Sequence, residues 1–153
     1  MYKKILIVVV LVLALLQVYQ PAQNNAELRE VAAFEAETQP NKIVKAVFEN
    51  NCYNCHSNKT EYPWYAAISP ISLLIDHHVA EGNEHFNVSV WEQYSDKKKD
   101  HKLDELIEEV GEGEMPEWSY TLIHGTITEI EKEAVLDWAQ GAREKYVLSA
   151  INK

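Results

Sequence analysis

Two cysteines and a histidine stand close together near the middle of the chain, in the run Cys52-Tyr53-Asn54-Cys55-His56. The C-x-x-C-H spacing is the signature of covalent c-type haem attachment. Each thiol adds to one haem vinyl group, and the adjacent imidazole is then held beneath the iron as the proximal ligand. The motif therefore predicts one covalently attached haem c per chain, bound through Cys52 and Cys55, with His56 as an iron ligand.

Three other kinds of site use the same cysteine spacing. A structural zinc site takes four Cys or His ligands, and because the chain has only 2 cysteines, zinc would need two distant histidines. A thioredoxin-like redox pair is expected beside a β-α-β pattern, which the flanking residues lack. A structural disulfide would leave the histidine after the cysteines without a role. Haem accounts for all three residues at once.

The second axial position of the iron separates electron transfer from ligand chemistry. Met115 is the one methionine besides Met1, and it lies between the flexible segment Gly111-Glu112-Gly113 and Pro116. A thioether ligand favours Fe(II) and raises the reduction potential. We therefore predict that Met115 is the distal ligand; the alternative is a methionine that fills a gap in the core.

Several histidines compete with Met115 for this position. His77 and His78 fall on an expected helix, His85 lies beyond it, and His124 precedes the last expected helix. Adjacent histidines on one helix point in different directions, so His77 and His78 cannot face one target together. His77, His78 and His124 stay open as alternative distal ligands. His101, in a charged run, is expected to face solvent.

An apolar stripe should deliver the haem motif. Ile43, Val44, Val47 and Phe48 recur at helical spacing directly before Cys52, which predicts a helix that leads into the motif. Aromatic side chains elsewhere are expected in the core, or against the haem: Trp64, Tyr65, Trp91 and Trp118.

Capping residues and glycines mark the other expected helices. The sequence predicts helices over 70–81, opened by Ser69 and Pro70 and stopped by Gly82; over 89–94, opened by the capping box Ser89-Val90-Trp91-Glu92; over 103–110, ended by Gly111 and Gly113; and from the capping box Thr128-Glu129-Ile130-Glu131 onward. The run Lys97–Lys99 is expected to be a solvated loop. No segment alternates convincingly over strand length and no repeat is visible, so the predicted fold class is all-α.

The first residues have the pattern of an export signal. Two lysines precede the unbroken apolar run Ile5–Leu16 in this chain of 153 residues. No A-x-A cleavage site follows, which favours a retained inner-membrane anchor over residues 5–19, although the run is shorter than the roughly 20 residues of a spanning helix. We predict a signal peptide or membrane anchor at 1–20, a linker at 21–40 and a haem-binding domain at 41–153.

Export and charge both bear on the partners. Haem c is attached outside the bacterial cytoplasm, and the periplasm is oxidising, so a periplasmic location agrees with the motif. The formal net charge of -10 argues against nucleic acid as a partner. It favours redox partner proteins with basic patches as electron donor and acceptor; the alternative is that the charge serves solubility alone.

Six short pieces of the chain together resemble a known family. They are Cys52–Asn58, Tyr62–Tyr65, Ser69–Ser72, His77–Val79, Gly113–Pro116 and Ser119–His124. The stretch from Asn51 to Trp138 is similar to the haem-binding domain proteins, small monohaem cytochrome-c-like proteins frequent in Bacteroidetes-type bacteria. The resemblance implies a cytochrome-c-like helical domain around a covalent haem, periplasmic electron transfer, and Met115 in the place of the usual Met-Pro distal ligand.

These observations predict a single-electron carrier rather than an enzyme. One haem and the lack of a catalytic carboxylate or arginine constellation leave little machinery for turnover, so no residue is assigned a catalytic role. The alternative is a haem-based gas or redox sensor, or a peroxidase-like protein, with an open or His-ligated distal site. In that case His77 or His78 would assist the chemistry.

Overall fold

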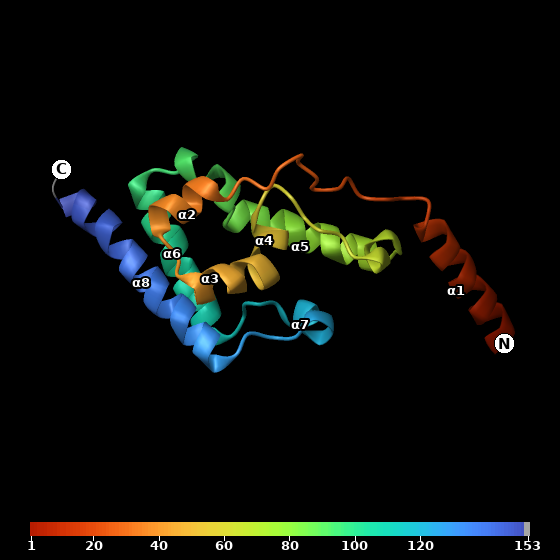
Figure 1. Cartoon of the computed structure of the whole chain (residues 1–153). Helices are drawn as coiled ribbons and strands as arrows, with labels where there is room; N and C mark the ends of the chain where they lie inside the picture. The colour runs from red at the N-terminus through yellow and green to blue at the C-terminus, as the bar shows by residue number, and fades with distance from the viewer. Residues whose placement is uncertain (152–153) are drawn as a thin grey trace.

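The computed structural model describes residues 1–151, with side chains through residue 148, and its regular structure is helical. Within this range no strand forms, and one isolated bridge pairs Asn25 with Lys59. The predicted all-α class is confirmed. Figure 1 shows α1 (Tyr2–Leu16) at one end, joined by an extended segment to the other helices. No helix in the described range has the length and apolar character needed to cross a bilayer.

Within residues 1–151, ten further elements follow α1. They are α2 (Ala32–Thr38), α3 (Lys42–Val47), the π-helical turn η1 (Phe48–Cys52), α4 (Tyr53–His56), η2 (Trp64–Ala67), α5 (Ile71–His85), η3 (Val88–Gln93), α6 (Asp96–Glu112), α7 (Trp118–His124) and α8 (Glu129–Ile151). The longest two, α6 and α8, pack antiparallel (Figure 1). Lys132 at the start of α8 donates to the Gly111 carbonyl (2.8 Å), and Arg143 further along donates to Asp100 (2.8 Å).

Phe34 lies at the centre of an aromatic core. Its side chain on α2 is fully buried, and its ring meets those of Phe86, Trp91 and Trp138 edge-on, with centroids 5.9, 5.1 and 5.9 Å away. Edge-to-face contacts are favoured because a ring edge is positive and a ring face negative. The segment predicted to be a linker at 21–40 thus supplies a helix and a central core residue. A single aromatic residue among alanine and glutamate gives no periodicity that would have revealed it.

The tryptophans divide between core and surface. Trp91 is fully buried, as expected, whereas Trp64 and Trp118 are 80% and 70% exposed. The core assignment is therefore wrong for these two, because they begin the short elements η2 and α7, which leave their side chains uncovered.

The helices predicted over 70–81, 89–94 and 103–110 all have different bounds in the structure. The helix predicted over 70–81 is α5, which begins at Ile71 and continues through Gly82 to His85. The stretch predicted to open with a capping box at Ser89 is η3, a 3₁₀ turn capped instead by Asn87, whose side chain accepts from Ser89 N–H (2.9 Å). The Ser89 hydroxyl is engaged elsewhere, because it donates to Asn58 (3.0 Å).

The second half of the chain follows the capping rules more closely. Helix α6 begins at Asp96, capped by Ser95, so the predicted loop Lys97–Lys99 is its first turn. It ends before Gly113, whose φ of 83° is a conformation that glycine adopts readily. The predicted box before α8 is confirmed: Thr128 N–H donates to Glu131 (2.8 Å), and Glu131 N–H donates to the Thr128 hydroxyl (3.3 Å).

A buried lysine ties α2 to α6 and α8. Lys99 is 8% exposed, and its amino group donates to both carboxylate oxygens of Glu37 (2.9 and 2.8 Å). Tyr146 on α8 also donates to Glu37 (2.8 Å). Burial opposes ionisation of Glu37, but the hydrogen bonds from Lys99 and Tyr146 outweigh it and lower the pKa of this carboxyl. Burying an unpaired ammonium group would destabilise the fold, and the hydrogen bonds to Glu37 offset that cost for Lys99.

Replacement of Glu37 by Gln should remove this stabilisation in a pH-dependent way. We expect a loss of about 1 kcal/mol at neutral pH, a modest value because 32% of the Glu37 side chain is exposed and water screens the pair. A carboxyl with a lowered folded-state pKa stabilises the fold above its unfolded value, near 4.5, and loses that effect as the pH falls through the folded pKa. Chemical denaturation should therefore show the difference between wild type and Glu37→Gln shrinking in acid. The exposed Glu108→Gln on α6 is the control, and an equal loss in both variants would contradict the assignment.

Candidate functional site

The haem motif lies where a helix changes its winding. Helix α3 begins with Asn41, whose side chain accepts from the N–H groups of Ile43 (2.9 Å) and Val44 (3.1 Å). It continues into η1, where Tyr53 N–H donates to the carbonyl of Phe48, five residues earlier. Such widened turns occur often at functional sites. The predicted helix into the motif is confirmed, and η1 and α4 place Cys52, Cys55 and His56 together.

The imidazole of His56 is held by the end of α5. Its Nδ1 lies 2.8 Å from the Phe86 carbonyl oxygen and 3.0 Å from that of Gly82. Because both partners only accept, Nδ1 carries the proton and Nε2 keeps its lone pair. In the described part of the chain, no protein group bonds to Nε2. Burial lowers the pKa of His56, against the opposing effect of the two carbonyls, so the ring is neutral at pH 7, as metal coordination requires.

Gly82 permits this arrangement by letting α5 approach α4. A Cβ at residue 82 would lie 2.6 Å from the Cys55 carbonyl oxygen and 3.1 Å from the Cys55 Cβ. Glycine is therefore required inside α5, where the sequence had predicted a stop. An isolated glycine within an apolar helical pattern also signals close packing, so the signal was present and was interpreted as a helix end.

The two thiols are not poised for redox exchange. Both are free, and burial raises the pKa of Cys52 to about 12 and that of Cys55 to about 11, with the Glu117 carboxylate adding to the second shift. Catalytic cysteines of redox pairs have lowered pKa values, because the thiolate is the nucleophile. The thioredoxin-like alternative lacks this property here.

The segment before α2 is hydrogen-bonded to the haem motif and to the turn that follows His56. Asn24 donates to the Ser57 carbonyl (2.8 Å), and Arg29 donates to the Asn54 side chain (2.9 Å) and the Lys59 carbonyl (3.1 Å). Each of these bonds joins residues 25 or more positions apart. Residues predicted to be a linker thus stabilise the haem motif and the turn after it through hydrogen bonds.

Met115 lies in the connection between α6 and α7. It is half-buried and packs against the hydrophobic core, and its N–H donates to the Glu109 carbonyl (3.1 Å) at the end of α6. The residues that follow Met115 lie close to the haem motif. The negative charge of Glu117 raises the pKa of the Cys55 thiol, and the hydroxyl of Tyr120 donates to the carbonyl of Asn50, two residues before Cys52 (2.6 Å). Sequence reasoning had not singled out Glu117 or Tyr120, although a glutamate directly before a helix is a capping signal.

The histidines considered as alternative ligands have other neighbours. His78 on α5 lies 3.7 Å from Glu117, whereas the adjacent His77 is exposed. His124 Nε2 and the Tyr65 hydroxyl share a hydrogen bond (2.7 Å), and the His124 ring stacks on the Tyr120 ring with centroids 4.3 Å apart. The remaining two pair with carboxylates on their own helices, His85 with Glu81 and His101 with Glu105, and both are exposed as expected for His101.

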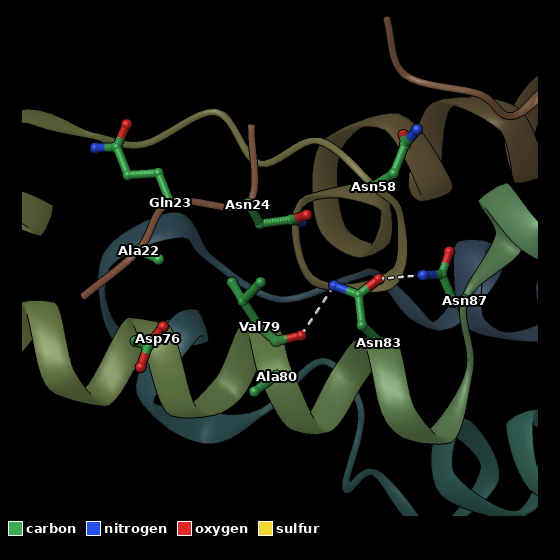
Figure 2. A pocket seen from close by; sticks show the side chains of 9 residues that line it. All are labelled: Ala22, Gln23, Asn24, Asn58, Asp76, Val79, Ala80, Asn83 and Asn87. Atoms are coloured by element: carbon green, nitrogen blue, oxygen red, sulfur yellow. Dashed lines mark hydrogen bonds between the residues drawn. The ribbon is translucent and has the colours of Figure 1, made fainter. Parts of the chain in front are cut away.

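A separate groove of about 360 Å³ lies between the N-terminal segment and α5 (Figure 2). Its lining is rich in amides: Ala22, Gln23, Asn24, Asn58, Asp76, Val79, Ala80, Asn83 and Asn87. Figure 2 shows that Asn83 and Asn87 bond to each other and Asn83 to the Val79 carbonyl, so these amides are satisfied within the protein. The groove includes none of the residues predicted to hold haem.

Comparison with known proteins decides the family. The model of the haem-binding domain family matches residues 11–141. The chain belongs to this family. It therefore binds haem, and the donor set fits such a group, because two free thiols and a neutral imidazole with an available Nε2 stand together on η1 and α4. No solved structure matches the chain.

One curated protein is similar over much of the chain. Cytochrome c peroxidase Ccp of Escherichia coli (strain K12) is 29% identical over 119 residues, which cover 74% of this chain and 26% of that protein. The chain thus spans about a quarter of the length of this relative. The similarity overturns the expectation that the chain is not an enzyme. That expectation rested on the lack of a catalytic constellation in this chain alone, and a peroxidase shares its sequence pattern.

Gly82→Ala should separate α4 from α5. Because the added Cβ would meet backbone and not a movable side chain, we expect a loss of roughly 1–3 kcal/mol in the free energy of unfolding, as for other overpacked sites. The yield of haem-loaded protein should fall with it. Gly141→Ala on α8 is the matched control, since a Cβ there meets open space and should stabilise the helix by about 0.5–1 kcal/mol. Equal effects of the two changes would contradict the role of Gly82.

Proposed function

We propose that this chain is a monohaem c-type redox protein that transfers single electrons. Cys52 and Cys55 hold the haem through thioether bonds, and Nε2 of His56 binds the iron. The observation that carries the proposal is the pair of hydrogen bonds from His56 Nδ1 to the carbonyls of Gly82 and Phe86 (3.0 and 2.8 Å), because they fix both tautomer and ring orientation. The bound haem supplies the redox chemistry by cycling between Fe(III) and Fe(II).

Met115 is the distal ligand in this proposal. It is half-buried, and it belongs to the segment whose next residues contact the motif through Glu117 and Tyr120. Its thioether favours Fe(II), which suits an electron acceptor. Two of the competing histidines already have other partners, which favours Met115 as the ligand: His78 lies beside Glu117, and His124 shares a hydrogen bond with Tyr65.

The protein's own residues prepare the site for electron transfer. Burial keeps His56 neutral, and the hydrogen bonds to the two carbonyls hold its ring in place, so little reorganisation accompanies a change in iron charge. The net charge of -10 favours redox partners with basic patches, whose association would weaken with rising ionic strength.

We further propose that the protein acts in the periplasm. The lysines and apolar run at the N-terminus direct export, and residues 5–19 serve as a signal peptide or as a tether to the inner membrane. Covalent haem attachment through two cysteines agrees with an extracytoplasmic site.

Peroxide reduction is the second candidate function, and the similarity to Cytochrome c peroxidase Ccp favours it. In that case the electrons end on hydrogen peroxide and not on a partner protein, which needs a distal position that peroxide can reach. Stopped-flow oxidation of the reduced protein by peroxide distinguishes the two. With Met115 bound, oxidation should be slow in wild type and faster in Met115→Ala. Fast oxidation of the wild type, unchanged by the substitution, would establish the peroxidase candidate instead.

Met115→Ala should convert the haem from six-coordinate to five-coordinate. We expect the weak near-infrared methionine-to-iron band of the oxidised protein to disappear, and carbon monoxide to bind rapidly to the reduced protein at neutral pH. A pyridine haemochrome assay on both variants verifies that covalent haem is present. The exposed His101→Gln on α6 is the control. An unchanged spectrum in Met115→Ala would remove Met115 from the coordination sphere, and lack of covalent haem in wild type would overturn the whole proposal.

A further inference from the structure

An ion-pair contact joins α5 to the segment that carries Met115. Nδ1 of His78 lies 3.7 Å from a carboxylate oxygen of Glu117, and the two side chains are 27% and 29% exposed. His78 lies on α5, one turn before Gly82. Glu117 follows Met115 by two residues. The contact therefore connects the helix that fixes His56 with the connection between α6 and α7.

Glu117 is itself rigidly placed. The same carboxylate oxygen accepts from the N–H groups of Ser119 (2.9 Å) and Tyr120 (3.3 Å), which caps α7, and it also accepts from the Ser119 hydroxyl. Pro116 separates Glu117 from Met115, and its ring fixes φ near −65°. Few backbone rotations are left between the carboxylate and the thioether, so holding Glu117 restricts Met115.

The segment is held at two further points. On the α6 side, the N–H groups of Glu114 and Met115 both donate to the Glu109 carbonyl (2.9 and 3.1 Å). On the side of η1, Tyr120 donates to the Asn50 carbonyl (2.6 Å). Among the hydrogen bonds and ion pairs of the described residues, the His78–Glu117 pair connects this segment to α5, the helix whose end carbonyls orient the His56 imidazole.

We propose that His78 is a positioning residue that holds Met115 at the distal side of the haem through Glu117. The inference rests on the proposed function, in which Met115 is the distal ligand. Helix α5 then sets both axial positions: the carbonyls of Gly82 and Phe86 orient His56, and His78 places the Met115 segment one turn earlier on the same helix. His78 acts through Glu117 and does not bind the iron.

Two substitutions break the contact and leave the other features in place. His78→Gln removes the imidazole but leaves Glu117 as the cap of α7. Glu117→Asp keeps a negative charge and a favoured N-cap side chain, but it is one methylene shorter and withdraws from His78. The control is His101→Gln, because His101 is exposed on α6 and pairs with Glu105 at 3.3 Å, away from Glu117 and His56.

The variants are compared as full-length protein with covalent haem. Each of His78→Gln and Glu117→Asp should weaken the near-infrared methionine-to-iron band and raise the rate of carbon monoxide binding to the reduced haem about two- to fivefold, the range expected for a partly exposed pair. The double variant should do no more than either single one, because both remove the same contact. Far-UV circular dichroism should match wild type, and His101→Gln should leave the band and the rate unchanged.

The outcomes separate this inference from the proposed function. A wild-type band that neither substitution changes would overturn the positioning role and leave Met115 as ligand. A five-coordinate haem in His78→Gln, with a six-coordinate haem in Met115→Ala, would make His78 the ligand and overturn both. Full additivity in the double variant would show that the two residues act separately, which also overturns the inference.

Discussion

The hydrogen bonds from His56 to the end of α5 are the constraint on which the site depends. The last carbonyls of a helix have no partners within the helix, and they form the negative end of its dipole. By accepting from Nδ1–H, the Phe86 carbonyl gains a partner and the imidazole gains a fixed orientation (2.8 Å). The consequence for the chain is strict: α5 must end at this place and pass close to α4. Gly82 meets the second requirement, because any larger residue would strike the Cys55 backbone.

The core holds this junction from the other side. Phe34, fully buried on α2, packs against Phe86 next to the carbonyl that His56 uses, and against Trp91 of η3. Asn24 and Arg29 bond to the backbone or side chains of the motif and its following turn. The pair of Glu37 with the buried Lys99 then connects α2 to α6. Proximal geometry and core packing are therefore one system, and α2 belongs to it as much as α4 does.

The sequence alone predicted the features that depend on local rules. The helix leading into the haem motif, the capping box before α8 and the all-α class all follow from spacing or from side-chain caps. It failed where long-range packing decided. Gly82 indicated a helix end from its local sequence. The glycine is needed because α5 passes close to Cys55, which lies 27 positions earlier and on another helix. Phe34 gave no local signal, because its partners lie on η1, directly after α5, on η3 and on α8. The Ser89 hydroxyl, which a capping box would have used, instead donates a hydrogen bond to Asn58.

The proposed distal side, at Met115, is built differently from the proposed proximal side, at His56, and this difference bears on the proposed function. His56 is held by two hydrogen bonds to helix backbone inside the protein, whereas the segment around Met115 is held by backbone bonds to Glu109 and by partly exposed side chains. A hydrogen bond of this kind contributes about 1 kcal/mol and a partly exposed ion pair less. In the proposed site, a small change in free energy would thus release the distal ligand while the proximal one stays bound. In this proposal, a haem that kept Met115 would pass electrons to partner proteins, and one that lost Met115 would be open to peroxide. A carrier and a peroxidase can therefore share one sequence pattern and differ mainly in how firmly the connection between α6 and α7 is held.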